Sequence, residues 1–167
     1  MNSWSEVSVP SGLATHDFPT LHLHDTASAK KKAIAKKPLY RMYVCGITPY
    51  DATHLGHAAT YLTFDLINRY LRATGAQVDY VQNITDIDDP LLERAQRDGI
   101  DWKDLAHQQI DLFRSDMEHL RVIPPAHYIG AVEAIPLVIE AIADLNDQSS
   151  IYKVDTCLLY TSDAADE

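Results

Sequence analysis

The chain has few cysteines, no uninterrupted apolar run of membrane length and no visible targeting segment. Cys45 and Cys157 are the only cysteines among 167 residues, which argues against a disulfide framework and predicts that Cys45 is a reduced thiol. The most apolar stretch, residues 128–145, is interrupted by Glu133 and Glu140, whereas a membrane span needs about 18 residues with few or no charges. The N-terminus lacks the basic segment and apolar core of a secretory signal. We therefore expect a cytoplasmic protein.

Basic side chains are also scarce. The sequence has 14 Lys and Arg against 24 Asp and Glu, a formal net charge of −10. This balance argues against a dedicated nucleic-acid binder, which needs basic surface to neutralise phosphates, although it leaves room for a local basic groove. The length is enough for one domain with a hydrophobic core and too short for two ordinary ones.

The order of predicted elements indicates a parallel α/β sheet. Residues 1–38 lack a sustained period, so we expect an extended arm with a short strand at Leu21–Asp25, and we interpret the lysine run of residues 30–37 as a solvated loop. Short β-rich apolar runs at residues 39–46 and 77–85 are typical of buried strands, and a helical pattern lies between them. Strand, loop, helix, strand is the beginning of a parallel α/β fold.

Three further helices are predicted, two of them from capping residues. Pro90 suits a first helical turn and Gly99 a helix end, which predicts a helix between them. Asp101 is a candidate N-cap for a helix that runs to about Leu120, and a last helix is expected over residues 131–145.

Two loops carry the candidate chemistry. In sheets of this kind ligands bind beyond the carboxyl ends of the strands, where residues 45–57 (CGITPYDATHLGH) and 83–89 (NITDIDD) fall. His54 and His57 stand at a predicted helix start, which favours phosphate binding, and Gly56 between them would let a planar base approach the backbone. Two capping or surface histidines would explain the spacing about as well.

The sequence leaves alternatives open at both strand ends. Cys45 suits a small buried core residue, a nucleophile or a metal ligand, and no second cysteine stands at metal-ligand spacing. The three aspartates of residues 83–89 suit turn and helix-cap chemistry, whereas Asn83 and Thr85 at the strand end could hold the polar groups of a ligand.

Taken together, these segments resemble the class I cysteine-activating enzymes. HLGH (54–57) is similar to the HIGH signature of class I aminoacyl-tRNA synthetases, and MYVCGITPYD and NITDIDD resemble the cysteine branch. That branch holds the cysteinyl-tRNA synthetases and the ligases that join cysteine to glucosaminyl-inositol in mycothiol biosynthesis. Thr53, Ala59 and Pro90 depart from the synthetase pattern, and Pro90 matches the ligases.

The resemblance implies a Rossmann-like catalytic domain that converts cysteine and ATP, with Mg²⁺, into cysteinyl-adenylate. It implies that His54 and His57 stabilise the phosphates of ATP and that Cys45 is one ligand of a catalytic zinc. The acceptor would be the amine of glucosaminyl-inositol, or tRNA(Cys) in the synthetase alternative. The implied contacts to the adenylate are Cys45, Gly46, Ile47, Thr48, Gly56, Thr60, Asn83, Ile84 and Thr85.

The resemblance is incomplete toward the C-terminus. We expect residues 39–154 to be the first part of the catalytic domain, because the remaining zinc ligands and the second, lysine-containing phosphate loop of the family are missing. Residues 157–167 do not continue the family pattern and are similar to a translated sequencing adapter, so we expect 155–167 to be a foreign, unpacked tail. An alternative of another class is a non-catalytic nucleotide-binding fragment, and we expect the chain alone not to activate cysteine.

Overall fold

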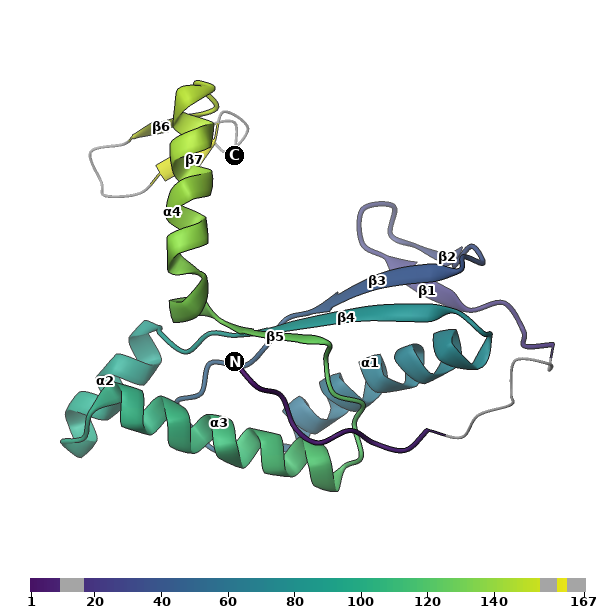
Figure 1. Cartoon of the computed structure of the whole chain (residues 1–167), viewed down its shortest axis with the longest axis horizontal. Coiled ribbons are helices and arrows are strands. Elements are labelled where there is room, and N and C mark those ends of the chain that lie inside the picture. Colours follow the sequence, from purple (N-terminus) through teal and green to yellow (C-terminus); the bar gives the residue numbers. More distant parts are fainter. Residues whose placement is uncertain (10–16, 154–158, 162–167) are drawn as a thin grey trace. The chain divides into compact units, whose positions relative to one another are not determined.

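The computed structural model describes residues 1–9, 17–153 and 159–161, which fall into two units, Met1–Gly130 and Ala131–Glu167. In chain order the first unit contains β1 (His22–Asp25), β2 (Lys30–Ala33), β3 (Leu39–Val44), α1 (Leu55–Ala73), β4 (Gln77–Ile84), α2 (Asp89–Asp98), α3 (Trp102–His119) and β5 (His127–Gly130) (Figure 1). The second contains α4 (Ala131–Asp147), β6 (Ile151–Lys153) and β7 (Leu159–Thr161). No helix in the described ranges has the length and apolar character needed to span a membrane.

A three-stranded parallel sheet in the order β3-β4-β5 organises the first unit. The register pairs Val44 of β3 with Gln82 of β4, so both strands end at the same edge. The parallel pairing predicted for the two β-rich runs is therefore confirmed, and α1 connects them as predicted. β5 was not expected from the sequence, because a four-residue strand after two prolines gives too short a pattern.

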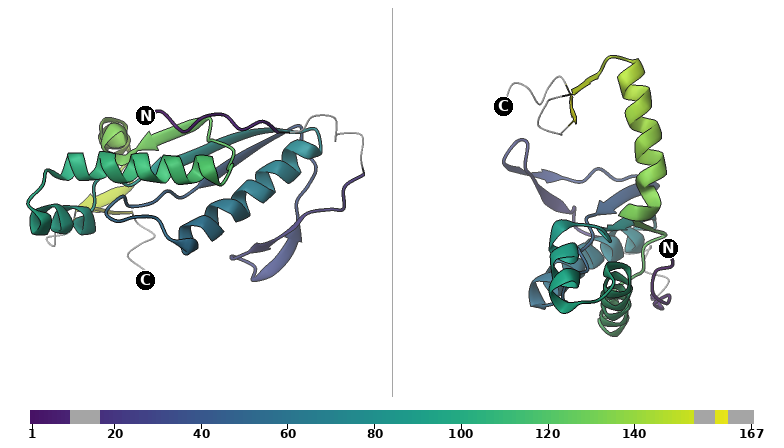
Figure 2. Two further views of the ribbon diagram at one scale, coloured as in Figure 1. Left: turned by 90° about the horizontal axis from the view of Figure 1, so that it is seen from below. Right: turned by 90° about the vertical axis from the view of Figure 1, so that its left-hand side faces the viewer.

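Helices α1 and α3 cover one face of this sheet, as the view from below shows (Figure 2). Every second residue of β4 is buried. The aromatic core lies beneath the sheet, where Phe113 of α3 is fully buried and its ring centroid is 5.0 Å from that of Tyr61 of α1. Trp4 packs edge-on against Phe113 and Tyr128, and its indole Nε1 donates to the carbonyl oxygen of Val122 at 2.7 Å.

The N-terminal segment is more ordered than a simple arm. The strand expected at Leu21–Asp25 is present as β1, but the lysine run is not a loop at its start, because Lys30–Ala33 forms β2 and pairs antiparallel with β1. All four residues of β2 are exposed, so its charged side chains stay in water while the backbone groups pair. The lysine side chains are thus solvated as expected, and the backbone of these residues still forms a strand.

The helix-capping predictions are confirmed. Asp88 caps α2, Pro90 lies in its first turn, and Gly99 ends it in the left-handed conformation with φ of 68°. Asp101 accepts from the backbone N–H groups of Lys103 and Asp104 at the start of α3. Local capping chemistry is readable from sequence because donor and acceptor lie within a few residues of each other.

In the second unit, α4 follows the predicted span of 131–145 to within two residues. Strand β7 pairs antiparallel with β6, with Leu159 opposite Lys153. The expectation that 155–167 is an unpacked tail is thus wrong for 159–161, which pair with β6. Residues 154–158, including Cys157, and 162–167 lie outside the described residues.

Candidate functional site

The candidate site is a cavity at the carboxyl end of β3, where the chain passes through a loop into α1. Its volume is about 440 Å³. The loop and the first two turns of α1 form its walls, which are lined by Cys45, Gly46, Ile47, Thr48, Tyr50, Asp51, Ala52, His54, His57, Thr60 and Tyr61. The structure thus brings together most of the residues that the sequence predicted for the site.

The floor of the cavity depends on a close approach between the loop and β4. The side-chain Oδ1 of Asn83 accepts from the backbone N–H of Gly46 at 2.8 Å and from the Tyr43 hydroxyl at 2.9 Å. The N–H of Thr85 donates to the carbonyl oxygen of Ile47 at 2.9 Å. The Thr85 bond joins the backbones of the two segments beyond the last residue of β3, and the Asn83 side chain adds a second connection between the loop and β4.

The predicted residues at the end of β4 and directly after it are placed differently from those of the first loop. Ile84 is fully buried and Ile47 nearly so, and both belong to the hydrophobic core. Ile47 still lines the cavity, whereas Asn83, Ile84 and Thr85 are not among its lining residues. Asn83 and Thr85 instead hold the first loop in place.

His54 and His57 form the N-terminal cap of α1. Nδ1 of His54 accepts from the N–H of Gly56 at 3.0 Å, and Nδ1 of His57 accepts from the N–H of His54 at 3.3 Å. The rings are stacked, with centroids 4.0 Å apart. A Cβ on Gly56 would lie 2.8 Å from Cε1 of His54, so glycine makes room for the capping ring. The interpretation of the two histidines as capping residues is thus confirmed.

Capping also determines which nitrogen of each ring can donate to a ligand. Because both Nδ1 atoms accept, we assign the proton of each neutral imidazole to Nε2. Both rings line the cavity, and the first turn of α1 contains no acidic residue. The N-terminus of α1 thus offers two Nε2–H donors in addition to its own backbone N–H groups, an arrangement suited to anionic oxygens.

Acid should loosen this cap. Burial, and secondarily the neighbouring His54, lowers the pKa of His57 below its usual 6.5. The unfolded chain therefore takes up the proton first, so the contribution to stability is complete above pH 6.5 and is lost as the pH falls from there toward the lowered pKa. We expect the urea midpoint of the chain to fall across that window, and to fall less for His57→Asn. Equal pH dependence in both proteins would contradict the assignment.

Cys45 is exposed, so the interpretation as a buried core residue is wrong. Its sulfur lies 3.9 Å from the Tyr43 hydroxyl, and its carbonyl oxygen accepts from the Tyr61 hydroxyl at 3.1 Å. No group of three or more His, Cys, Asp or Glu side chains within residues 1–9, 17–153 and 159–161 is placed to hold a metal ion. The residues described here therefore do not fit a zinc centre by themselves.

Several site residues were missed by the sequence analysis. Tyr50, Asp51 and Ala52 line the cavity, and Arg94 of α2 reaches them from another part of the chain. Nothing in the local sequence pattern around Arg94 distinguishes it from Arg97, one turn later, because its partners are more than 40 residues away.

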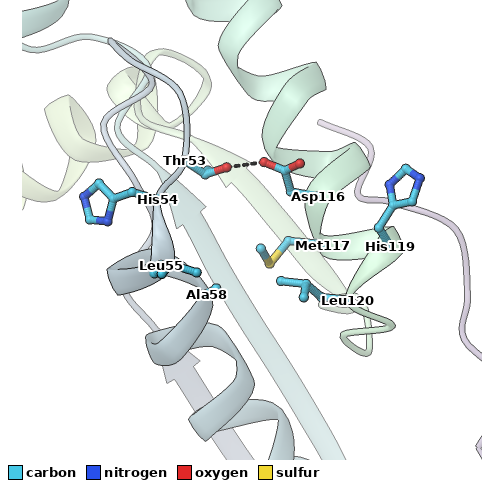
Figure 3. A pocket seen from close by; sticks show the side chains of 8 residues that line it. All are labelled: Thr53, His54, Leu55, Ala58, Asp116, Met117, His119 and Leu120. Atoms are coloured by element: carbon cyan, nitrogen blue, oxygen red, sulfur yellow. Dashed lines mark hydrogen bonds between the residues drawn. The ribbon is translucent and has the colours of Figure 1, made fainter.

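A second cavity, of about 400 Å³, lies between the start of α1 and the end of α3 (Figure 3). His54 lines both cavities. The Thr53 hydroxyl donates to the carboxylate of Asp116, which ties the residue before the cap to α3. Apolar side chains of Leu55, Met117 and Leu120 make up much of the remaining wall. Thr53, a departure from the synthetase pattern, thus has a structural partner.

Comparisons with known proteins agree with the fold. A family model described as the catalytic domain of class I (C) tRNA synthetases matches residues 31–167, a range that includes the predicted foreign tail. The chain is 22% identical to a solved Mycobacterium tuberculosis methionyl-tRNA synthetase in complex with methionyl-adenylate, with a TM-score of 0.64 over 70% of this chain and 23% of that one. At that identity the likeness concerns the fold alone, and it confirms the Rossmann-like class predicted from sequence.

Curated relatives are considerably more similar. The chain is 56% identical over 164 residues to the L-cysteine:1D-myo-inositol 2-amino-2-deoxy-alpha-D-glucopyranoside ligase of Thermomonospora curvata, covering 96% of this chain and 39% of the relative. It is 60% identical over 156 residues to ligase 2 of that name from Corynebacterium jeikeium, covering 93% and 37%. The chain therefore spans about two-fifths of the length of the curated relatives it matches.

Proposed function

Because the chain belongs to the family of class I (C) tRNA synthetase catalytic domains, we propose that it forms the nucleotide- and cysteine-binding part of a cytoplasmic, ATP-dependent cysteine ligase. The enzyme would activate L-cysteine as cysteinyl-adenylate and pass the cysteinyl group to the amine of glucosaminyl-inositol. The observation that carries this proposal is the single cavity that unites the loop after Cys45 with the two Nε2–H donors of His54 and His57.

In the first step, a carboxylate oxygen of cysteine attacks the α-phosphorus of ATP, a new P–O bond forms, and the bond to the pyrophosphate oxygen breaks. Negative charge grows on the leaving phosphates. Donors of His54 and His57 that are already oriented by the helix cap can stabilise that charge without reorganising. The N–H groups at the start of α1 add a fixed positive potential.

In the second step, the amine of the acceptor attacks the carbonyl carbon of the mixed anhydride. An amide bond forms, AMP leaves with the electrons of the broken C–O bond, and the amine loses a proton to solvent. The stacked, capped histidines take no part as bases in this scheme, because each Nδ1 lone pair is committed to a backbone N–H.

Cys45, which also lines the cavity, is a further candidate for contact with the substrate. Its thiol is exposed and lies beside the Tyr43 hydroxyl. We propose that it contributes one thiolate ligand to a zinc ion whose other ligands lie outside the residues described here. A thiolate is a soft ligand that suits zinc.

The choice of acceptor rests on the curated relatives. Those at 53–60% identity carry the name of the ligase, and Pro90 follows the ligase pattern in the sequence. A cysteinyl-tRNA synthetase is the alternative, since it shares the family model and the first step. A nucleotide-binding fragment without turnover is the alternative of another class.

Two assays on a protein of the relatives' full length separate these functions. Cysteine-dependent exchange of labelled pyrophosphate into ATP measures the first step, and we expect it with cysteine and not with serine. Amide formation is then measured with glucosaminyl-inositol and, separately, with tRNA(Cys). A product with the amino sugar alone supports the ligase, a product with tRNA alone supports the synthetase, and absence of exchange would contradict both.

A further inference from the structure

The β3–α1 loop reaches across to α2, and a single arginine makes most of that connection. Nη1 of Arg94 donates to the carboxylate of Asp51 at 2.8 Å and to the carbonyl oxygen of Tyr50. Its Nε donates to Asp98 at 3.1 Å on the same helix. The side chain is 24% exposed, whereas that of Asp51 is 69% exposed. Asp51 thus depends on Arg94 for much of its fixed position.

The bonded loop residues are part of the candidate site. Tyr50, Asp51 and Ala52 line the cavity and lie just before His54 in the chain. Oδ1 of Asp51 also accepts from the N–H of Ala52 at 2.8 Å, so the arginine fixes side chain and backbone together. Charge-assisted hydrogen bonds with two acceptors impose geometry as well as attraction.

Helix α2, which carries Arg94, is packed against α3. Leu91 and Ala95 of α2 are buried in a small cluster with Leu105 and Ala106 of α3. A weaker tie runs beside it, where the Thr48 hydroxyl donates to the carboxylate of Asp88 at 3.3 Å. The loop is therefore connected to a packed helix pair, and Arg94 provides the charged part of the connection.

We propose that Arg94 is a positioning residue that holds the β3–α1 loop as a wall of the cavity and thereby sets the entry of the chain into the His54 cap. Its kinetic consequence rests on the proposed function, whereas its effect on the loop does not. The residue acts through Tyr50, Asp51 and Ala52.

The chain offers a matched control on the same helix. Arg97 is 71% exposed and hydrogen-bonds Asp98 at 2.8 Å, so Arg97→Ala removes an arginine and an ion pair while leaving the bonds to the loop in place. Arg94→Lys keeps the positive charge and loses the planar fork, in which Nη1 bonds the loop while Nε bonds Asp98 of α2.

Hydrogen exchange on the 167-residue chain tests the effect on the loop. In Arg94→Ala we expect the amides of Tyr50 and Ala52 to exchange at least about tenfold faster, the effect of losing a hydrogen bond to a charged group. Core amides of β4 should be unchanged, and Arg97→Ala should match the wild type throughout. Wild-type exchange at Tyr50 and Ala52 in Arg94→Ala, or equal acceleration in Arg97→Ala, would overturn the proposal.

Kinetics on a protein of the relatives' full length test the consequence. A displacement of about 1 Å can cost about 100-fold in rate, so we expect a loss of that order in kcat/KM for pyrophosphate exchange in Arg94→Ala. Arg97→Ala should lose less than about fivefold, as for an exposed ion pair. Arg94→Lys should retain most of the defect, and full recovery with lysine would overturn the requirement for the fork.

The two arms separate the two ideas. If the loop amides exchange hydrogen faster in Arg94→Ala and the full-length wild-type protein shows no pyrophosphate exchange at all, the positioning role stands and the proposed function fails. If the loop amides exchange hydrogen faster while pyrophosphate exchange stays normal in Arg94→Ala, the proposed function stands and the positioning role is overturned.

Discussion

Replacing His54 by asparagine is expected to lower cysteine-dependent pyrophosphate exchange by about 100- to 1000-fold, the usual cost of losing a preorganised donor to a developing charge. The free energy of unfolding should change little. The reason is that the two ring nitrogens of His54 have separate tasks. An asparagine side chain places an acceptor near the position of Nδ1, which accepts from Gly56, and asparagine is a favoured N-cap residue. It has no atom at the position of Nε2.

His57 provides the complementary experiment. The longer side chain of His57→Gln places an amide N–H close to the position of Nε2, whereas the amide of His57→Asn ends near the position of Nδ1. His57→Gln should therefore retain more pyrophosphate exchange than His57→Asn. His54→Ala removes both tasks and should reduce stability as well as exchange. Near-normal exchange in His54→Asn and His57→Asn would contradict the assignment of Nε2 as the donor in both rings, and a large loss of stability in His54→Asn would contradict its capping geometry.

Gly46→Ala is expected to destabilise the chain by at least about 3 kcal/mol, at the severe end of single substitutions. A Cβ on Gly46 would lie 1.6 Å from the carbonyl oxygen of Asn83 and 2.5 Å from its carbonyl carbon. Both atoms belong to the backbone of β4, so no side-chain rotation relieves the overlap. Relief requires the loop to move away from β4, which also breaks the bond from the Gly46 N–H to the Asn83 side chain.

Gly99→Ala is the matched control for that experiment. A Cβ there meets no atom within 4 Å, and the cost comes only from the left-handed φ of 68°. We expect about 1 kcal/mol for that strain. Urea denaturation of the 167-residue chain, followed by far-UV circular dichroism, measures both variants. Equal midpoints for the two alanine variants would show that the overlap at Gly46 is relieved cheaply and that the close approach of loop and strand is not required.

Local patterns were sufficient for the elements whose signals lie within a few residues. The β-rich apolar run of β4, the Asp101 cap and the Gly99 helix end all predicted the structure correctly. Strand β2 was missed because its residues are all exposed and mostly lysine, a pattern typical of a solvated loop, although its partner β1 lies just before it in the chain. Strand β5 was missed because it has four residues and pairs with β4, a distant segment. Trp4, in a segment without any period, was missed for the same reason, since its partners Phe113, Val122 and Tyr128 lie more than 100 positions away.

For the site, the sequence by itself determined the two loops, the family motif and the pair of histidines at a helix start. It left open whether Cys45 is buried and whether the histidines cap or bind. Only the tertiary structure decided that Cys45 is exposed and that the capping bonds use Nδ1 and leave Nε2 for a ligand. It also decided that Arg94, and not Arg97, holds the cavity wall. These outcomes depend on which atoms of distant segments approach one another, and a one-dimensional pattern does not encode that approach.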